Sequence, residues 1–208
     1  GKKVQVECVS ANPTGPLHVG HGRGAAYGAS LASLLDFAGF KVTREFYVND
    51  AGRQMDILAL STWLRYLELH GATIPFPKNA YQGDYVRDMG RAIHKAHGTR
   101  YRRDAAHVTD GAPDAATDAE AHLDALIANA KELLGDDYAY VHNFVLTEQL
   151  GDSREDLAEF GVHFDHWFSE RSLFDTGLVD KAIALLEKNG HVYQQDGAKW
   201  FRSTGFGD

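Results

Sequence analysis

The sequence predicts an α/β fold, in which a parallel sheet carries a mainly helical insertion and a β-hairpin lies near the C-terminus. Three observations lead to this prediction. Over residues 4–71, alternating apolar positions give way to helical spacing twice, which is the order strand, helix, strand, helix. Between residues 71 and 161 the apolar pattern is helical, with no confident strand. An Asp-Gly pair at 196–197 separates two short β-prone segments, a strong hairpin signal.

The first strand and the first helix are predicted on either side of a loop rich in glycine and proline. Alternation of Val4, Val6 and Cys8 with polar neighbours indicates a strand over residues 4–9. The loop SANPTGPLHVGHGRG follows at residues 10–24. A helix is then predicted from about Gly20 to a stop at Gly39. Its amphipathic face would comprise Tyr27, Leu31, Leu34, Leu35 and Ala38.

The remaining elements follow from the same spacing rules. Residues 41–48, KVTREFYV, predict a strand, and a helix ending near Gly71 would place Ile57, Leu60, Leu64 and Leu67 on one side. Further helices are predicted at 85–98, 119–135, 136–160 and 179–190, with an exposed loop or frayed helix at 100–118 and the hairpin at 191–204. We therefore divide the chain into a first sheet region (1–71), a helical insertion (72–163) and a return to the sheet domain (164–208).

The composition is that of an ordinary globular protein, with 44% hydrophobic and 24% charged residues. We find neither an apolar run of the roughly 18 residues that a membrane span needs nor a secretory signal, and we expect no membrane partner. The single cysteine, Cys8, cannot form an internal disulfide, which fits a cytoplasmic location. A net charge of −8 argues against a surface that wraps nucleic acid throughout, but it leaves room for a local basic face.

His18 and His21 stand where the first strand gives way to the first helix. A helix N-terminus presents free N–H groups and a partial positive charge, which suit an anion. Gly20 and Gly22 let a ligand approach the backbone without meeting a Cβ atom. Two imidazoles at this position can donate hydrogen bonds to a polyphosphate whose charge grows during reaction. The pair therefore indicates electrostatic catalysis of a phosphate reaction, with His18 and His21 as the catalytic residues.

Two other His-x-x-His pairs occur, and the sequence favours structural interpretations for both. His94 and His97 belong to a predicted helix rich in Lys and Arg, which indicates a solvated face. His163 and His166 flank Phe164 and Trp167, which favours packing. We predict no metal site, because no third ligand stands at a recognisable spacing from any of these pairs.

The segment Ser10-Ala11-Asn12-Pro13-Thr14-Gly15-Pro16-Leu17-His18-Val19-Gly20-His21 closely resembles the HIGH signature of class I aminoacyl-tRNA synthetases. Its flanking residues resemble the arginyl-tRNA synthetase family in particular, as do REFYVNDAGRQMD (44–56), YQGDYVRDM (81–89) and DGAKWFRSTGFGD (196–208). The resemblance implies that the sheet is the first half of a Rossmann-like class I catalytic domain. It also implies an arginine–tRNA ligase, which activates L-arginine with ATP and Mg²⁺ and transfers it to tRNA(Arg).

The resemblance implies a role for each residue of the signature. His18, Gly20, His21 and Gly22 would bind ATP, and Glu7, Ser10, Asn12 and His21 would bind arginine. A carboxylate on a strand end can hold a guanidinium through two hydrogen bonds. Structural alternatives stay open: Glu7 as an edge-strand surface charge, Asn12 as an Asx-turn residue, Ser10 as a loop hydrogen bond. Asn49 and Asp50 end the second strand, where α/β sheets bind ligands, or they simply form a turn.

The lysine-rich KMSKS loop of the family is not found in these 208 residues. Because the chain also begins at Gly1 without a methionine, we expect a fragment that is inactive or nearly so alone. A parallel sheet cut in half leaves an open strand edge, so we also expect self-association.

Two other classes of function are compatible with parts of the sequence. A nucleotidylyltransferase of the HxGH superfamily also uses paired histidines, but it would need neither the long insertion nor Glu7 with Asn12. A non-catalytic module could instead bind tRNA or a protein partner through the insertion. Its contact would use the segment HKAHGTRYRR, with Lys95, Arg100, Arg102 and Arg103 around Tyr101. A solvated basic loop is the structural alternative for this segment.

Overall fold

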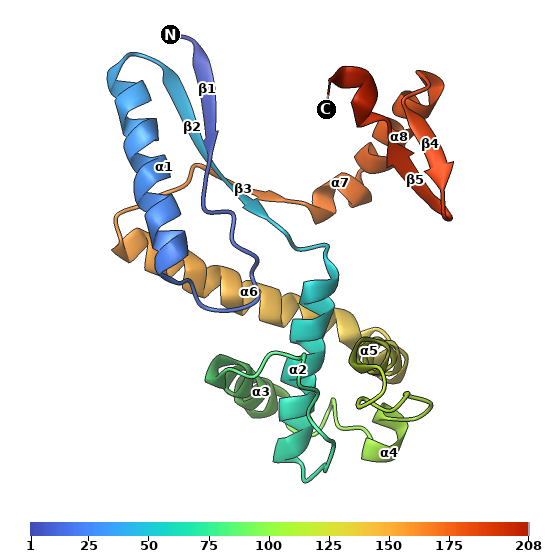
Figure 1. Ribbon diagram of the computed structural model, residues 1–208. Coiled ribbons are helices and arrows are strands. Elements are labelled where there is room, and N and C mark those ends of the chain that lie inside the picture. The colour runs from blue at the N-terminus through green and yellow to red at the C-terminus, as the bar shows by residue number, and fades with distance from the viewer. Residues whose placement is uncertain (208) are drawn as a thin grey trace. The chain divides into compact units, whose positions relative to one another are not determined.

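The computed structural model describes residues 1–207, and the chain divides into two compact units, Gly1–Phe168 and Ser169–Asp208. The first unit contains a small sheet and a helical layer built around one central helix (Figure 1). This confirms the predicted mixed α/β class, with a parallel strand pair and a separate antiparallel hairpin.

The sheet has the strand order β1 (Lys3–Glu7), β2 (Lys41–Val48) and β3 (His166–Ser169). β1 and β2 run parallel, with Glu7 opposite Glu45. The strand β3 was not predicted, because four residues are too few to show a period. It is recruited from far along the chain: Asp165 donates its backbone N–H to the carbonyl of Arg44 (2.9 Å) and accepts the Arg44 N–H on its carboxylate (2.7 Å).

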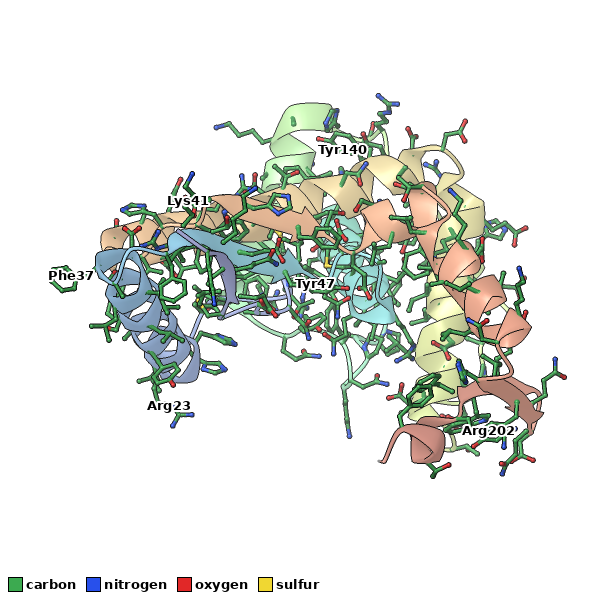
Figure 2. The ribbon with its side chains drawn as sticks, turned by 90° about the horizontal axis from the view of Figure 1, so that it is seen from above. Arg23, Phe37, Lys41, Tyr47, Tyr140 and Arg202 are labelled. Atoms are coloured by element: carbon green, nitrogen blue, oxygen red, sulfur yellow. The ribbon has the colours of Figure 1, made fainter. Side chains whose placement is uncertain are left out.

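Helix α1 (Val19–Phe37) lies against the sheet through small residues. Its buried positions are Ala25, Gly28 and Ala32, and a Cβ atom at Gly28 would collide with the thiol of Cys8. The predicted helix is confirmed, but its expected apolar face is not the one that packs. Tyr27, Leu34 and Phe37 are 73%, 67% and 94% exposed, and Figure 2 shows Phe37 pointing away from the helix and the sheet. Close approach to the sheet selects the small side chains instead.

The helical layer surrounds α2 (Arg53–Leu69), which is buried on nearly all sides. Its neighbours are α3 (Asp84–His97), α5 (Ala119–Leu134) and α6 (Asp137–Glu159), as Figure 1 shows. All four helices agree with the sequence prediction. The segment 100–118 differs from it, because it contains the short helix α4 (Ala105–Val108) and two buried side chains, Tyr101 and Val108.

The second unit contains α7 (Arg171–Asp175), α8 (Leu178–Lys188), the strands β4 (Val192–Gln195) and β5 (Ala198–Phe201), and a 3₁₀ turn at Ser203–Phe206. The predicted hairpin is confirmed. Asp196 and Gly197 both have positive φ values, +52° and +77°, as a type I′ turn requires. None of the helices in residues 1–207 combines the length and the apolar character of a membrane span.

Candidate functional site

The residues proposed for substrate binding come from the carboxyl ends of β1 and β2, the edge at which parallel sheets bind ligands. Ser10 organises the first group. Its hydroxyl donates a hydrogen bond to the carboxylate of Glu7 and accepts one from the backbone N–H of Tyr47 (3.0 Å). The Glu7 side chain is thereby held at the end of its strand.

The turn that places Ser10 is strained. Val9 and Ser10 have φ values of +66° and +42°, in the left-handed region that a β-branched residue such as Val9 rarely adopts. Such strain is often found at functional sites, where the surrounding structure holds it in place. Here it folds the chain back so that Ser10 reaches both Glu7 and Tyr47.

Asn12 is held on both sides by other amide side chains. Its Nδ2 donates to Oε1 of Gln54 (2.8 Å), and its Oδ1 accepts from Nδ2 of Asn49 (3.1 Å). Asn12 therefore bonds to neighbouring elements and not only within its own loop. Gln54 was not predicted from the sequence, because its contact with Asn12 spans 42 positions, and for Asn49 the sequence left a ligand role and a turn role open. Asp50, its companion, is buried.

His18 and His21 form the start of α1 together. Nδ1 of His18 accepts from the N–H of Gly20 (3.1 Å), and Nδ1 of His21 accepts from the N–H of His18 (3.2 Å). Their rings stack, with centroids 3.8 Å apart and planes 21° apart. Because each Nδ1 accepts, each neutral ring carries its proton on Nε2 and can donate it to a ligand.

The pKa of His21 is consistent with a neutral ring that donates a hydrogen bond through Nε2. Burial, and secondarily the neighbouring charge of His18, lower the pKa of His21 below its usual 6.5. The ring is therefore neutral at pH 7, with one donor nitrogen. A Cβ atom at Gly20 would lie 2.9 Å from Cε1 of His18, so the glycine leaves room for that ring, whereas Gly22 has open space around it.

The loop between β1 and α1 is supported by the helical layer. Tyr85, near the start of α3, donates its hydroxyl proton to the carbonyl of Thr14 (2.7 Å), and a Cβ atom at Gly15 would lie 3.1 Å from the same hydroxyl. Burial, and then the nearby Tyr81, raise the pKa of Tyr85 to about 12, so the hydroxyl keeps its proton. Sequence reasoning did not find this residue, since only contact across 71 positions reveals it.

The other histidine pairs have partners of their own. His94 contacts His70 (Nδ1 to Nε2, 3.2 Å), and His97 contacts the hydroxyl of Tyr140 (2.6 Å). His163 and His166 are both exposed, so the pair does not pack among Phe164 and Trp167 as predicted; His166 instead pairs with Glu45 (2.8 Å) and contacts the ring of Phe168 edge-on. Among residues 1–207 no group of three or more His, Cys, Asp or Glu side chains could hold a metal ion.

The structure does not bring Arg100, Arg102 and Arg103 to the strand ends. Arg102 and Arg103 line a cavity beyond the C-terminal end of α2, whereas Gln54 stands at the start of that helix. The 17 residues of α2 separate the two places by about 25 Å.

Comparison with known proteins indicates a similarity to arginyl-tRNA synthetases, as the sequence motifs do. Residues 1–74 match the family described as the catalytic domain of class I tRNA synthetases (R). The whole chain is 69% identical to 37% of the arginine–tRNA ligase of Aromatoleum aromaticum. It is 70% identical to 36% of that of Nitrosospira multiformis. The chain thus spans a little over a third of the length of these relatives.

Solved structures agree in fold. The whole chain matches 39% of a Campylobacter jejuni protein assigned as an arginyl-tRNA synthetase, with a TM-score of 0.76 and 27% identity. In addition, 94% of it matches 28% of the Thermus thermophilus arginyl-tRNA synthetase, with a TM-score of 0.54 and 26% identity. The paired histidines at the start of α1, the similarity over every residue and the shared fold lead to one conclusion: the chain is similar along its whole length to a part of the arginyl-tRNA synthetases.

Proposed function

We propose that this chain carries part of the active site of an arginine–tRNA ligase, with ATP, L-arginine and tRNA(Arg) as substrates. The observation that carries the proposal is the stacked pair of His18 and His21, whose Nε2 donors are free while their Nδ1 atoms cap α1. Paired donors at a helix N-terminus suit the phosphates of ATP, together with the backbone at Gly20 and Gly22.

In the first step the carboxylate of arginine attacks the α-phosphorus of ATP, and pyrophosphate leaves as arginyl-adenylate forms. Negative charge builds on the departing phosphates, where donors at His18 and His21 stabilise the transition state more than the ground state. In the second step the terminal ribose of the tRNA attacks the carbonyl carbon of the adenylate, and AMP leaves. Mg²⁺ accompanies ATP as part of that substrate, and we assign no residue to it.

Glu7 is assigned to the cationic side chain of arginine, with Ser10 holding its carboxylate. A planar guanidinium offers two parallel donors to a carboxylate, which distinguishes arginine from lysine. Asn12, held by Gln54 and Asn49, is assigned to the backbone groups of arginine. Since the lysine-rich signature is not found in residues 1–208, we propose that the chain by itself has little or no activity.

A chimera tests the function. The present chain replaces the matching segment of the Aromatoleum aromaticum ligase, and arginine-dependent exchange of pyrophosphate into ATP is measured with tRNA(Arg) present. We expect exchange by the chimera and almost none by the 208 residues alone. Loss of exchange in a folded chimera contradicts the proposal, and robust exchange by the chain alone contradicts the incomplete site.

Glu7→Gln in the chimera separates the ligase from a nucleotidylyltransferase. Glu7 is exposed at the end of its strand, and loss of a hydrogen-bonded charged partner costs about 1.5–3 kcal/mol, so we expect the KM for arginine to rise about tenfold or more. The KM for ATP should change little, because Glu7 does not contact the nucleotide in this proposal. An unchanged KM for arginine would remove Glu7 from the substrate site and favour the nucleotidylyltransferase alternative.

A further inference from the structure

The helical insertion contains a cavity that the ligase chemistry at the strand ends does not use. It has a volume of about 670 Å³ and lies beside the C-terminal end of α2 and the segment that leads into α4. Six of its lining residues matter here: Leu67, His70, Thr73, Thr99, Arg102 and Arg103. Its location coincides with the basic segment identified in the sequence.

The structure distinguishes the three arginines of that segment. Arg100 forms an ion pair with Asp137 (2.7 Å). Arg103 donates to backbone carbonyls, including that of Leu133 (2.8 Å), and so satisfies the last turn of α5. Arg102 is exposed on the cavity wall, and its guanidinium makes no ion pair or hydrogen bond with any of the described residues. That charge is therefore uncompensated, with five N–H donors available.

Neutral donors surround Arg102. The hydroxyls of Thr73 and Thr99 line the same wall and are exposed. His70 also lines the wall, but its ring contacts His94 through Nε2 and hydrogen-bonds the backbone of Gly98, so its role there is structural. The lining carboxylate, Asp104, is occupied as the cap of α4, where it accepts the N–H of Ala106 (3.0 Å). The wall thus offers Arg102 and two threonine hydroxyls as donors, and one carboxylate oxygen of Asp104 is engaged in the α4 cap.

The charge pattern of the sequence concentrates positive charge at this place. Residues 91–107 contain five Lys and Arg residues against one acidic residue, in a chain with a net charge of −8. A local cationic surface on an acidic protein attracts a polyanion there and repels it elsewhere. Among polyanions, a phosphate diester chain suits a guanidinium fork flanked by hydroxyl donors.

We propose that this cavity binds a backbone phosphate of RNA, with Arg102 as its charged ligand and Thr73 and Thr99 as neutral donors. The proposal rests on the proposed function in taking tRNA as the RNA. It assigns Arg100 and Arg103 to structural roles, whereas the sequence alone grouped all three arginines as contacts.

Binding of fluorescein-labelled tRNA(Arg) to the 208-residue chain tests the site, by anisotropy between 50 and 200 mM salt. Arg102→Gln should weaken binding about five- to tenfold and reduce the slope of log K against log salt by about one. Lys95→Gln is the matched control, since it removes one positive charge from exposed α3 outside the cavity lining. It should change the affinity less than twofold. Thr99→Val, which keeps the charge, should weaken binding two- to threefold.

Three other outcomes of the binding measurement would overturn the site. Equal losses for Arg102→Gln and Lys95→Gln would show a diffuse attraction instead of a cavity contact. No loss for Arg102→Gln, in a variant whose circular dichroism matches the parent, removes the phosphate ligand. Tighter binding of a poly-glutamate peptide than of tRNA would identify an acidic protein as the occupant. If the chimera shows no exchange but Arg102→Gln still weakens RNA binding selectively, the ligase function is rejected and the site is kept. If the chimera is active but Arg102→Gln has no selective effect, only the site is rejected.

Discussion

The hydroxyl of Tyr85 lies 2.7 Å from the carbonyl oxygen of Thr14, and this hydrogen bond joins helix α3 to the loop that precedes His18. Helix α3 therefore supports the loop that positions the paired histidines. Tyr85→Phe removes the donor and leaves the carbonyl of Thr14 without it, at a cost of about 1–3 kcal/mol.

In the chimera, Tyr85→Phe should raise the KM for ATP several-fold and leave the KM for arginine nearly unchanged, because the loop leads to the histidines. Pyrophosphate exchange at varied ATP and arginine measures both constants. Tyr81→Phe, on the same segment, is the control. Equal changes in both KM values would indicate a general loss of structure and would reject this positioning role.

Gly20→Ala should impair the pair of histidines. A methyl group at position 20 would lie 2.9 Å from Cε1 of His18, so the ring must move away from its stacked position. We expect exchange by the chimera to fall at least tenfold. Gly24→Ala, which meets nothing within 4 Å on the same helix, should leave exchange unchanged and slightly stabilise α1. Similar losses in both variants would show that helix propensity, and not the His18 ring, sets the rate.

Gln54→Ala should weaken arginine binding through Asn12. Without Oε1 of Gln54, the amide of Asn12 loses one of its two partners and is held by Asn49 alone. The KM for arginine in the chimera should rise about three- to tenfold while the KM for ATP stays constant. Gln54→Glu, which keeps an acceptor oxygen, should recover most of the loss. If Gln54→Glu does not recover the loss, Gln54 does not act by holding Asn12: it either contacts arginine directly or has no role in arginine binding.

The lowered pKa of His21 predicts the direction of a pH effect. In the folded chain the pKa of His21 lies below 6.5, whereas in the unfolded chain it is near 6.5. Stability is therefore unaffected well above 6.5 and falls as the pH drops through 6.5 toward the folded pKa. An NMR titration should give a His21 midpoint below 6.5. His18→Asn, which keeps a capping side chain, should move that midpoint upward; a downward shift would contradict the stated cause.

The exposed apolar side of α1 predicts self-association of the chain alone. Tyr27, Leu34 and Phe37 are largely exposed, and their burial against a second copy is favourable at about 25 cal/mol per Å². Sedimentation should show dimers or larger species at tens of micromolar, and the double variant Leu34→Lys with Phe37→Lys should be monomeric. Association that persists in this variant would point to the open edge of the sheet, and a monomeric parent would contradict both.

Features set by neighbouring residues were predictable from the sequence. The turn at Asp196-Gly197, the four long helices of the first unit outside α1 and the start of α1 near Gly20 all follow from local spacing and turn chemistry. The similarity to arginyl-tRNA synthetases is likewise visible in the sequence, because residues 10–21 form one uninterrupted motif that resembles the HIGH signature.

Features that depend on distant partners were not predictable. Strand β3 exists because Asp165 meets Arg44 across 121 positions, and Asn12 meets Gln54 across 42. The packing face of α1 was misjudged for a related reason. A hydrophobic pattern weighs large side chains most, whereas the sheet accepts only Ala25, Gly28 and Ala32 at close range.

Helix α1 packs on the sheet through small side chains only, and this affects how readily its backbone hydrogen bonds open. Small side chains remove little apolar surface from water, whereas α2 is enclosed by helices on nearly all sides. Amide protons of α1 should consequently exchange with deuterium long before those of α2. A ligand bound by His18 and His21 would slow amide exchange in α1 and not in α2. The deuterium uptake of α1 would therefore report whether the site is occupied.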